Sequence, residues 1–429
     1  MKVDVLLGLQ WGDEGKGKIV DVLTPQYDII ARFQGGPNAG HTLQIAGDKH
    51  VLHTIPSGIF HPEKINIIGN GVIADPYILT QELAKLVLKG VDPRINLRIS
   101  KRAHLILPTH RMLDAAYEQA MGEGKIGSTL KGIGPCYTDK TARYGLRFGD
   151  ILSPDFGTKY NQLKQRHLNI LKSYNFELTD QFIDKISFEE YEKNWFIAVE
   201  ELRTFPLIDS ELYINKALAE GKTILAEGAQ GSLLDVDFGS YPYVTSSNTI
   251  TAGVCSGLGI PPSAIGKVFG VFKAYCTRVG SGPFPTELND ATGENLRDHG
   301  KEFGSTTGRP RRCGWLDLPA LRYAIMLNGV TDLVMMKSDV MNTFETINIC
   351  TGYEVNGQIV QDLTYETLSN PVTPLYESFP GWKQALHGIA DYQMLPERLK
   401  EYTAFIEKDA GLPVKILSTG AGREETIIK

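Results

Sequence analysis

A lysine-bearing, glycine-rich loop follows the first apolar run of the chain. Residues 3–7 form this short run, which predicts a buried strand. The loop after it contains glycines and charged residues: Gly8, Gly12, Asp13, Gly15, Lys16, Gly17 and Lys18. Glycines let backbone N–H groups approach an anion, while lysine and the N-terminus of a following helix supply countercharge. This pattern is typical of a phosphate-binding loop.

One part of the strict phosphate-loop motif is missing. That motif has Ser or Thr directly after its lysine, where the hydroxyl binds Mg²⁺, but Gly17 follows Lys16. If a metal ion binds here, Asp13 is the nearest candidate ligand. A glycine-rich strand-to-helix turn in an unrelated α/β protein would have the same pattern, so this stretch alone leaves both interpretations open.

The same arrangement recurs along the chain, because short apolar runs repeatedly end in loops rich in Gly, Asn or Ser. These loops lie at Gly8, Gln34, Glu227, Lys337 and Ser418. Helical segments between the runs favour parallel pairing. In a parallel sheet the carboxyl ends of the strands share one edge, where ligands bind. We therefore predict an α/β fold with a large, mostly parallel central sheet flanked by helices, similar to that of P-loop NTPases.

The pattern divides the chain into three predicted regions. Residues 1–102 and 204–270 would form the central nucleotide-binding sheet, residues 103–203 a mainly helical insertion with a polar loop, and residues 271–429 a smaller C-terminal α/β part. Residues 277–314 are predicted to form a long loop without secondary structure. Because it contains Arg309, Arg311 and Arg312, whose guanidinium groups bind anions in a bidentate way, we predict anion binding there rather than disorder.

Composition excludes several classes of protein. The chain has 429 residues, a formal net charge of -6 and 42% hydrophobic residues. No run approaches the roughly 18 apolar residues of a membrane helix, and no signal peptide is visible. Five scattered cysteines without a CxxC pair indicate reduced thiols in the cytoplasm and no zinc site. The mild acidity argues against a nucleic-acid partner.

A possible base-recognition element follows the apolar run at residues 333–336. An aspartate such as Asp339 accepts hydrogen bonds from guanine N1–H and the 2-amino group, whereas adenine offers neither donor there, and the stem of Lys337 would pack over the base. A K-x-D tripeptide also occurs by chance, so its position after a strand and downstream of a phosphate loop is what favours guanine binding.

Six long blocks resemble the adenylosuccinate synthetase family over nearly the whole chain. They are WGDEGKGK (11–18), NAGHT (38–42), EGAQG (227–231), YPYVTSSNT (241–249), TRVGSGPFPTE (277–287) and TTGRPRRCGWLD (306–317). The resemblance implies a homodimer that ligates L-aspartate to IMP with GTP, through 6-phosphoryl-IMP, giving adenylosuccinate, GDP and phosphate. This reaction is the first committed step of AMP synthesis from IMP.

The resemblance also implies residue roles. Asp13 would be the general base, His41 the general acid and Gln230 a further catalytic residue, while one Mg²⁺ per subunit would bind Asp13 and the Gly40 backbone. The implied GTP contacts are Gly12, Gly15, Lys16, Gly17, Lys18, Gly40, Thr42, Arg311, Lys337, Ser338, Asp339, Ser418, Thr419 and Gly420. The implied IMP contacts are Asp13, Asn38, Thr129, Arg143 from the partner subunit, Gln230, Thr245 and Arg309. The implied aspartate contacts are Ser305, Thr306, Thr307, Gly308, Arg309 and Arg311.

The chemistry explains these residue types. The 6-oxygen of IMP is a poor leaving group, and removing the N1 proton gives it the negative charge needed to attack the γ-phosphate. Charge developing there requires a cation and a proton donor such as His41. A lone histidine is usually structural, but the glycine-rich loop around His41 favours a functional role. Pro37, Leu130–Lys131 and Pro310 depart from the family pattern without removing a residue that has a proposed role.

Two other functions share some of these features. A GTP-dependent switch would need the phosphate and guanine elements but no site that binds a dicarboxylate. A phosphotransferase of the nucleotide-kinase type would need a second nucleotide site but not aspartate. The arginine-rich loop and Gln230 therefore favour the ligase over both alternatives.

Overall fold

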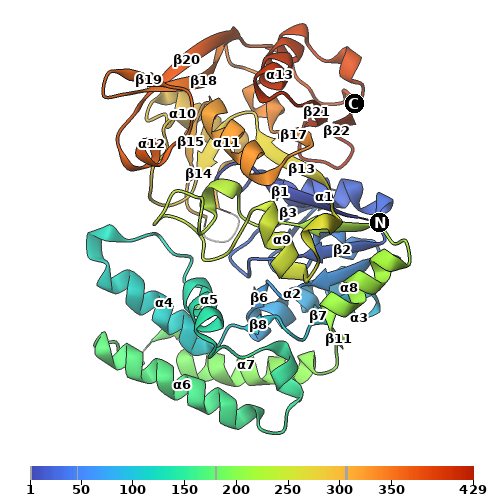
Figure 1. Ribbon diagram of the computed structural model, residues 1–429, viewed down its shortest axis with the longest axis vertical. Coiled ribbons are helices and arrows are strands. Elements are labelled where there is room, and N and C mark those ends of the chain that lie inside the picture. Colours follow the sequence, from blue (N-terminus) through green and yellow to red (C-terminus); the bar gives the residue numbers. More distant parts are fainter. Residues whose placement is uncertain (1, 46, 179–180, 305–307) are drawn as a thin grey trace.

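The computed structural model describes residues 2–45, 47–178, 181–304 and 308–429, and a ten-stranded sheet runs through its centre (Figure 1). The strands in spatial order are β11 (Leu207–Ile208), β7 (Leu97–Ser100), β5 (Ile65–Ile68), β2 (Ile29–Arg32), β12 (Ile224–Glu227), β1 (Val3–Gly8), β13 (Ile265–Lys273), β17 (Asp332–Met336), β21 (Val414–Ser418) and β22 (Thr426–Ile428). Neighbouring strands pair in parallel except β21 and β22. The predicted mostly parallel sheet is confirmed.

Strand β1 lies between two apolar layers. Val3, Val5 and Leu7 pack in one core, and Leu6 packs on the opposite face under helix α1 (Lys16–Leu23). Because both faces are covered, the strand is apolar along nearly its whole length rather than alternating. The loop after β1 and the N-terminus of α1 are thereby fixed at the middle of the sheet edge.

The insertion lies beside the sheet, at the bottom of Figure 1. Its helices are α4 (Pro108–Ala120), α5 (Ile133–Ala142), α6 (Phe156–Ser173) and α7 (Phe188–Leu202), with a small hairpin of β9 (Phe182–Ile183) and β10 (Ile186–Ser187). They share a core around the buried Trp195, whose indole N–H donates to Ile106 O at 2.9 Å. Helix α7 packs against α2 (Pro76–Leu88), which anchors the insertion to the sheet.

The other elements complete the two ends of the molecule. Near the insertion lie α3 (Pro93–Asn96), β6 (Ile73–Ala74) paired with β8 (His104–Leu105), and α8 (Ser210–Ala219). Helix α9 (Thr251–Leu258) lies between β12 and β13 in the chain. The C-terminal part contains β16 (Leu316–Asp317), α11 (Leu318–Asn328), β18 (Thr346–Val355), β19 (Gln358–Val360), α12 (Tyr365–Ser369), β20 (Thr373–Pro380) and α13 (Glu397–Ala410). Strands β18 and β19 form a hairpin around Asn356–Gly357. In the described part of the chain, no helix is both long and apolar enough to cross a membrane.

Two local predictions were wrong. Residues 277–314 are not a structureless loop, because they contain α10 (Ala291–Gly300) and most of the ladder between β14 (Cys276–Arg278) and β15 (Arg312–Gly314). The side chain of Asp290 caps α10 by accepting from Thr292 N–H and Gly293 N–H. His41 does not lie in a loop but begins β3 (His41–Ile45), which pairs antiparallel with β4 (Asp48–Leu52).

Candidate active site

The phosphate loop is folded around a carboxylate. Glu14 is fully buried, accepts N–H bonds from Gln10 at 3.2 Å and Gly12 at 2.9 Å, and forms an ion pair with Lys16. A Cβ at Gly8 would lie 2.3 Å from Glu14 Oε2, so glycine is required there. Backbone donors and a lysine thus converge on an anionic group, as a phosphate site requires. A phosphate would have to replace this carboxylate at the same donors.

Asp13 lies at the end of a line of buried charges. Its side chain is 30% exposed and accepts a hydrogen bond from Arg311 Nε at 2.8 Å. Arg311 also pairs with Glu302, which pairs with the fully buried Lys273 at 3.0 Å. Burial alone would raise the pKa of Glu302, but Lys273, Lys337 and Arg311 outweigh it and lower that pKa to about 2. Glu302 is therefore ionised and holds Arg311 toward Asp13.

His41 is held by a second buried carboxylate. Its Nδ1 lies 2.5 Å from Glu227 Oε1, and Glu227 also accepts from Ser57 N at 2.8 Å and Ser57 Oγ at 2.6 Å. Burial and the charge of Arg32 lower the pKa of His41, although Glu227 opposes them. For Glu227, burial favours a higher pKa, but the bonds from His41 and Ser57 together with nearby Arg32 lower it. The ring therefore donates Nδ1–H to an ionised Glu227.

The other ring nitrogen of His41 is available to a ligand. Within the described residues, Nε2 is buried and has no hydrogen-bond partner. The base of the His41 side chain packs against the start of α1, because a Cβ at Gly17 would lie 2.9 Å from His41 Cβ. Asp13, in the loop directly before α1, flanks the same helix end. Both proposed acid–base groups therefore lie beside the phosphate loop.

Three loops converge where IMP binding was predicted. Gln34 Nε2 donates to Ala229 O at 2.9 Å and to Gln230 Oε1 at 3.3 Å. The backbone of Gln230 also lies close to Gly12, since a Cβ on that glycine would be 3.7 Å away. Asn38 belongs to the loop of Gln34, and its Oδ1 is buried without a partner in the described structure. Polar atoms from the ends of β1, β2 and β12 thus meet.

Helix α5 joins the insertion to this region. Tyr137 OH accepts from Gly35 N at 3.0 Å and donates to Gly71 O at 2.8 Å. A Cβ at Gly134 would lie 3.5 Å from Ser246 Oγ, next to the predicted contact Thr245. Arg143 follows α5 in a left-handed conformation (φ 69°) and is exposed. The structure thus brings Thr245 near α5 and leaves Arg143 on the surface of the subunit.

The predicted guanine elements lie side by side after β17 and β21. Ser338 Oγ donates to Ser418 O at 2.7 Å, and Lys337 Nζ donates to Gly300 O at 2.8 Å. Asp339 Oδ1 and Thr419 Oγ1 are buried and, counting described residues only, without partners. Burial raises the pKa of Asp339, although the charges of Lys337 and Lys18 oppose the change. Acceptors suited to guanine donors are therefore present.

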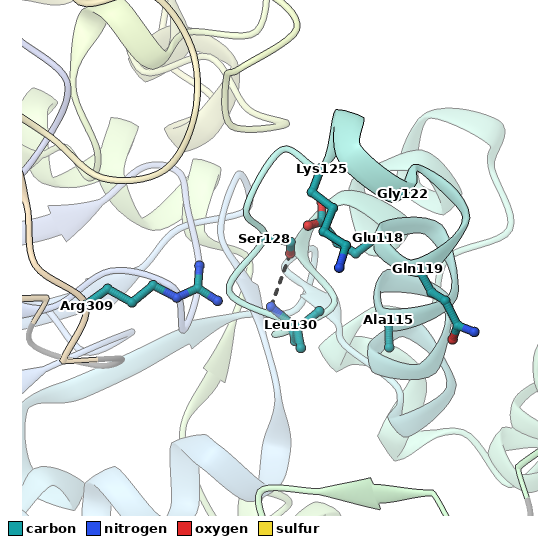
Figure 2. Close-up of a pocket in the computed structure, with 8 residues that line it drawn as sticks. All are labelled: Ala115, Glu118, Gln119, Gly122, Lys125, Ser128, Leu130 and Arg309. Atoms are coloured by element: carbon teal, nitrogen blue, oxygen red, sulfur yellow. Dashed lines mark hydrogen bonds between the residues drawn. The ribbon is translucent and has the colours of Figure 1, made fainter.

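The predicted aspartate loop borders a pocket of about 620 Å³ (Figure 2). Arg309 reaches into it from the C-terminal part, and the lining residues of the insertion are Ala115, Glu118, Gln119, Gly122, Lys125, Ser128 and Leu130. Arg309 Nη1 donates to Gly127 O at 3.4 Å, beside the predicted IMP contact Thr129. The pocket shares Arg309 with the predicted site but lies on its insertion side. Ser305, Thr306 and Thr307 lie outside the described residues, and Gly308 is exposed.

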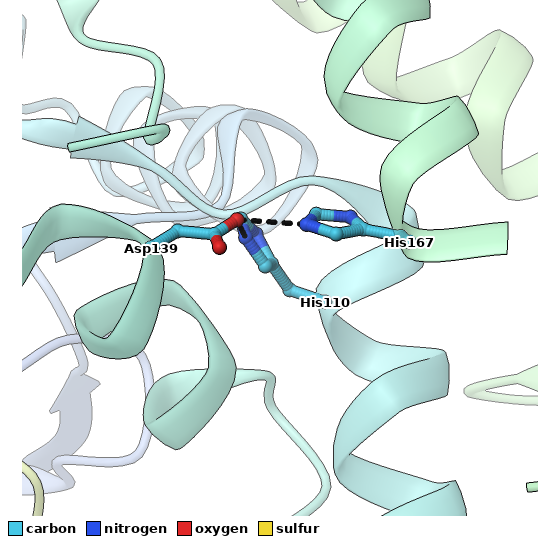
Figure 3. Close-up of side chains that lie close together, drawn as sticks. All are labelled: His110, Asp139 and His167. Atoms are coloured by element: carbon cyan, nitrogen blue, oxygen red, sulfur yellow. Dashed lines mark hydrogen bonds and ion pairs between the residues drawn. The ribbon is translucent and has the colours of Figure 1, made fainter. Parts of the chain in front are cut away.

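The structure reveals a second polar cluster, which the sequence did not predict (Figure 3). Asp139 Oδ2 lies 2.9 Å from His110 Nε2 and 2.7 Å from His167 Nε2, close enough for a shared metal ion. However, His110 Nδ1 accepts the N–H of Leu107 at 2.9 Å, so its proton must be on Nε2. That nitrogen has no lone pair for a metal. We therefore interpret the cluster as hydrogen bonds that join α4, α5 and α6.

Comparison with known proteins matches this geometry to one family. The sequence model described as adenylosuccinate synthetase matches residues 5–427. Adenylosuccinate synthetases of Cytophaga hutchinsonii and Porphyromonas gingivalis are each 58% identical to this chain, cover 100% of it, and are themselves covered over 98% and 99% of their length.

The chain belongs to the adenylosuccinate synthetase family.

Solved structures agree with this assignment. A fully ligated adenylosuccinate synthetase from Plasmodium falciparum has a TM-score of 0.93 and 38% identity, with 100% of both chains covered. The succinoaminodeoxyadenylate synthetase of cyanophage S-2L has a TM-score of 0.63 and 20% identity, covering 100% of this chain and 95% of that one, and shares the fold. As a member of the adenylosuccinate synthetase family, the chain is a GTP-dependent ligase.

Several residues around the site received no role from the sequence. Glu14 and Glu227 lie inside family motifs, Glu14 next to Asp13 in the phosphate loop and Glu227 at the end of strand β12, so the motifs were the available signal. Glu302 and Lys273 had no local signal, because their partners are 9 and 29 residues away in segments that only the fold brings together. All four are buried and hold predicted site residues or the phosphate loop.

Proposed function

We propose that this chain ligates L-aspartate to IMP with GTP, using Asp13 as general base and His41 as general acid. The observation that carries this assignment is that both side chains flank the N-terminus of α1, with His41 Nε2 buried and free of partners among described residues. A proton acceptor and a proton donor then stand on either side of a phosphate loop. Family membership favours the ligase over the GTP switch and the nucleotide kinase.

The first step would transfer the γ-phosphoryl group to IMP. Asp13 takes the proton from N1 of the purine, and the 6-oxygen, now negative, attacks the γ-phosphorus while GDP leaves. Arg311 donates a hydrogen bond to Asp13, so IMP must compete with this guanidinium for the carboxylate. Negative charge brought by the triphosphate beside His41 raises the pKa of the ring and favours the protonated form that stabilises the oxyanion.

The second step would replace the phosphate with aspartate. The amine of L-aspartate attacks C6 of 6-phosphoryl-IMP, the C6–O bond breaks, and inorganic phosphate leaves with its electron pair. We propose that Arg309 and Arg311, together with residues 305–308, bind the two carboxylates of the amino acid. Arginine suits this task because its planar fork makes two parallel hydrogen bonds to a carboxylate.

The residues also suit a magnesium ion. Asp13 offers a carboxylate oxygen and Gly40 a backbone carbonyl, both hard donors that Mg²⁺ prefers beside phosphates. The carboxylate of Asp13 is partly exposed and so accessible to an ion. When bound, Mg²⁺ would neutralise charge on the phosphate oxygens. We propose one such ion per subunit.

We propose further that the active unit is a cytoplasmic homodimer in which Arg143 completes the IMP site of the partner subunit. The exposed position of Arg143 at the end of α5 supports this proposal. Helix α5 also contacts the loops predicted to bind IMP. A neighbouring subunit that packs against this helix would therefore lie close to the same nucleotide.

The proposal is tested by mixing IMP, GTP, Mg²⁺ and L-aspartate and following the ultraviolet absorbance of the purine. We expect absorbance change and GDP release only when all components are present. GTP turnover that ignores IMP and aspartate would instead indicate the switch. Phosphate transfer to a nucleotide without any need for aspartate would indicate the kinase.

A further inference from the structure

Lys18 belongs to the phosphate loop by sequence, but its ammonium group is bound elsewhere. The residue is 7% exposed, and Nζ donates to Ser418 Oγ at 2.8 Å, Gly420 O at 2.9 Å and Glu425 O at 2.9 Å. An ammonium group has three donors. All three are therefore used by one segment, residues 418–425, which we call the guanine loop. In this arrangement Lys18 has no donor left for a phosphate oxygen.

A second side chain of the same helix binds the same loop. Asp21 accepts from Arg423 Nε at 2.6 Å and Arg423 Nη2 at 2.8 Å, and its Oδ1 also lies 3.0 Å from His61 Nε2. Lys18 and Asp21 are three positions apart, so they lie on one face of α1. Helix α1 thus holds the guanine loop at two independent points.

The guanine loop is also connected to the other base-recognition residues. Ser338 Oγ donates to the carbonyl of Ser418, which places residues 338–339 directly beside the loop. Burial lowers the pKa of Lys18 to about 8, although the charges of Glu425 and Asp339 oppose the change. Because Asp339 must meet two donors on one edge of the base, a shift of the opposing loop would spoil the alignment.

We propose that Lys18 is a positioning residue for guanine recognition, which holds the guanine loop against α1 and does not bind phosphate. The inference rests on the proposed use of GTP. It assigns two tasks to the first turn of one helix: the backbone N-terminus faces the triphosphate, and the side chain of Lys18 fixes the loop that meets the base. Helix α1 then sets the distance between the site that binds the base and the site that binds the triphosphate.

The test compares GTP with inosine triphosphate, whose base lacks the 2-amino group. For each enzyme the ratio of kcat/KM with GTP to kcat/KM with inosine triphosphate is measured. We expect Lys18→Met to lower this ratio by about tenfold or more, because the selectivity of a hydrogen-bonding site depends on its alignment. Lys16→Met is the matched control. It removes a lysine two positions away that pairs with Glu14 inside the phosphate loop. It should therefore lower kcat/KM equally with both nucleotides and leave the ratio unchanged.

If Lys18→Met lowers kcat/KM equally with both nucleotides and leaves their ratio unchanged, the inference is overturned. Lys18 would then be assigned to phosphate binding. If Lys18→Met does not fold, Lys18→Gln decides by the same ratio, which should again fall, because a neutral amide with two N–H donors cannot replace the three bonds of the ammonium group. Asp21→Asn, which weakens only the outer attachment, should lower the ratio less than Lys18→Met. Failure of the proposed function is distinguishable, because the wild-type enzyme would then show no turnover that depends on IMP and aspartate.

Discussion

Replacing Glu227 by Gln removes one charge next to His41 and keeps the side-chain shape. In the structure Glu227 is fully buried and accepts from the His41 ring at 2.5 Å and from two donors of Ser57. A glutamine can still accept a hydrogen bond from the ring, but it cannot stabilise an imidazolium. If His41 acts as an acid, this charge is what makes its protonated form accessible in a buried site next to Arg32.

The size of the effect follows from the geometry. With Oε1 and Nδ1 in contact, the two charge centres are roughly 4 Å apart, where opposite charges interact by about 4 kcal/mol at an effective dielectric constant of 20. That energy corresponds to about 10³-fold in the population of protonated His41. We therefore expect kcat to fall by about 10³ in Glu227→Gln, within the range that general acid catalysis contributes. The KM values for IMP and GTP should change only a few-fold.

The decisive measurement is the dependence of kcat on pH, from steady-state rates of wild type and Glu227→Gln with all substrates between pH 6 and 9. In the variant, log kcat should rise as the pH is lowered, because protonation of His41 has become limiting. Arg32 lies directly opposite Glu227 in the sheet, so the variant should also lose about 3 kcal/mol of unfolding free energy. Rates are therefore measured well below its melting temperature.

Ser57→Ala is the matched control. It removes one hydroxyl donor to Glu227 and leaves both charges in place, so kcat should fall by no more than about 10²-fold, the loss of one hydrogen bond to a charged group. A folded Glu227→Gln enzyme with kcat within tenfold of wild type and an unchanged pH profile would refute the reasoning. His41 would then not act as an acid through this pair.

Three further predictions concern the base, the dimer and acid stability. Asp13→Asn should lower kcat by at least about 10² while the circular dichroism spectrum stays unchanged, because the amide can still accept from Arg311; near-normal rates would remove the base assignment. Mixing inactive Asp13→Asn subunits with inactive Arg143→Leu subunits should restore part of the activity, whereas a mixture that stays inactive would show that Arg143 acts within its own subunit. Burial lowers the pKa of His110 to about 4, against about 6.5 in the unfolded chain, so the folded state binds fewer protons and its unfolding free energy falls as pH decreases from 6.5 to 4. Urea unfolding at pH 7 and pH 5 should show a larger loss for wild type than for His110→Gln, and equal losses would contradict this explanation.

The strands at the centre of the sheet were predictable because burial of both faces makes them continuous apolar runs. Parallel pairing predicted that the loops share one edge of the sheet, but not their order along it. Helix α10 was missed because it buries few side chains, with Leu296 as its main apolar contact, and depends on the cap at Asp290. Strand β3 was missed because its residues alternate over only one short hairpin, with Leu43 buried while Thr42 and Gln44 are exposed.

The proposed site residues were named from motifs, but the residues that hold them were not. The contact between His41 and Glu227 joins residues 186 positions apart, and the contact between Arg311 and Asp13 joins residues 298 apart. No local pattern encodes such pairs, because they depend on which strands become neighbours. For the same reason the sequence placed Lys18 with the phosphates, whereas its hydrogen bonds go to the guanine loop.

The attachment of α1 to the guanine loop has a consequence during synthesis of the protein. Lys18 and Ser418 are 400 positions apart, so a ribosome makes the phosphate strand and its helix long before the segment that reads the base. A nascent chain therefore carries Lys18 well before the acceptors that bind its ammonium group have been made. The proposed nucleotide selection would then be completed only when strand β21 docks beside β17, late in folding.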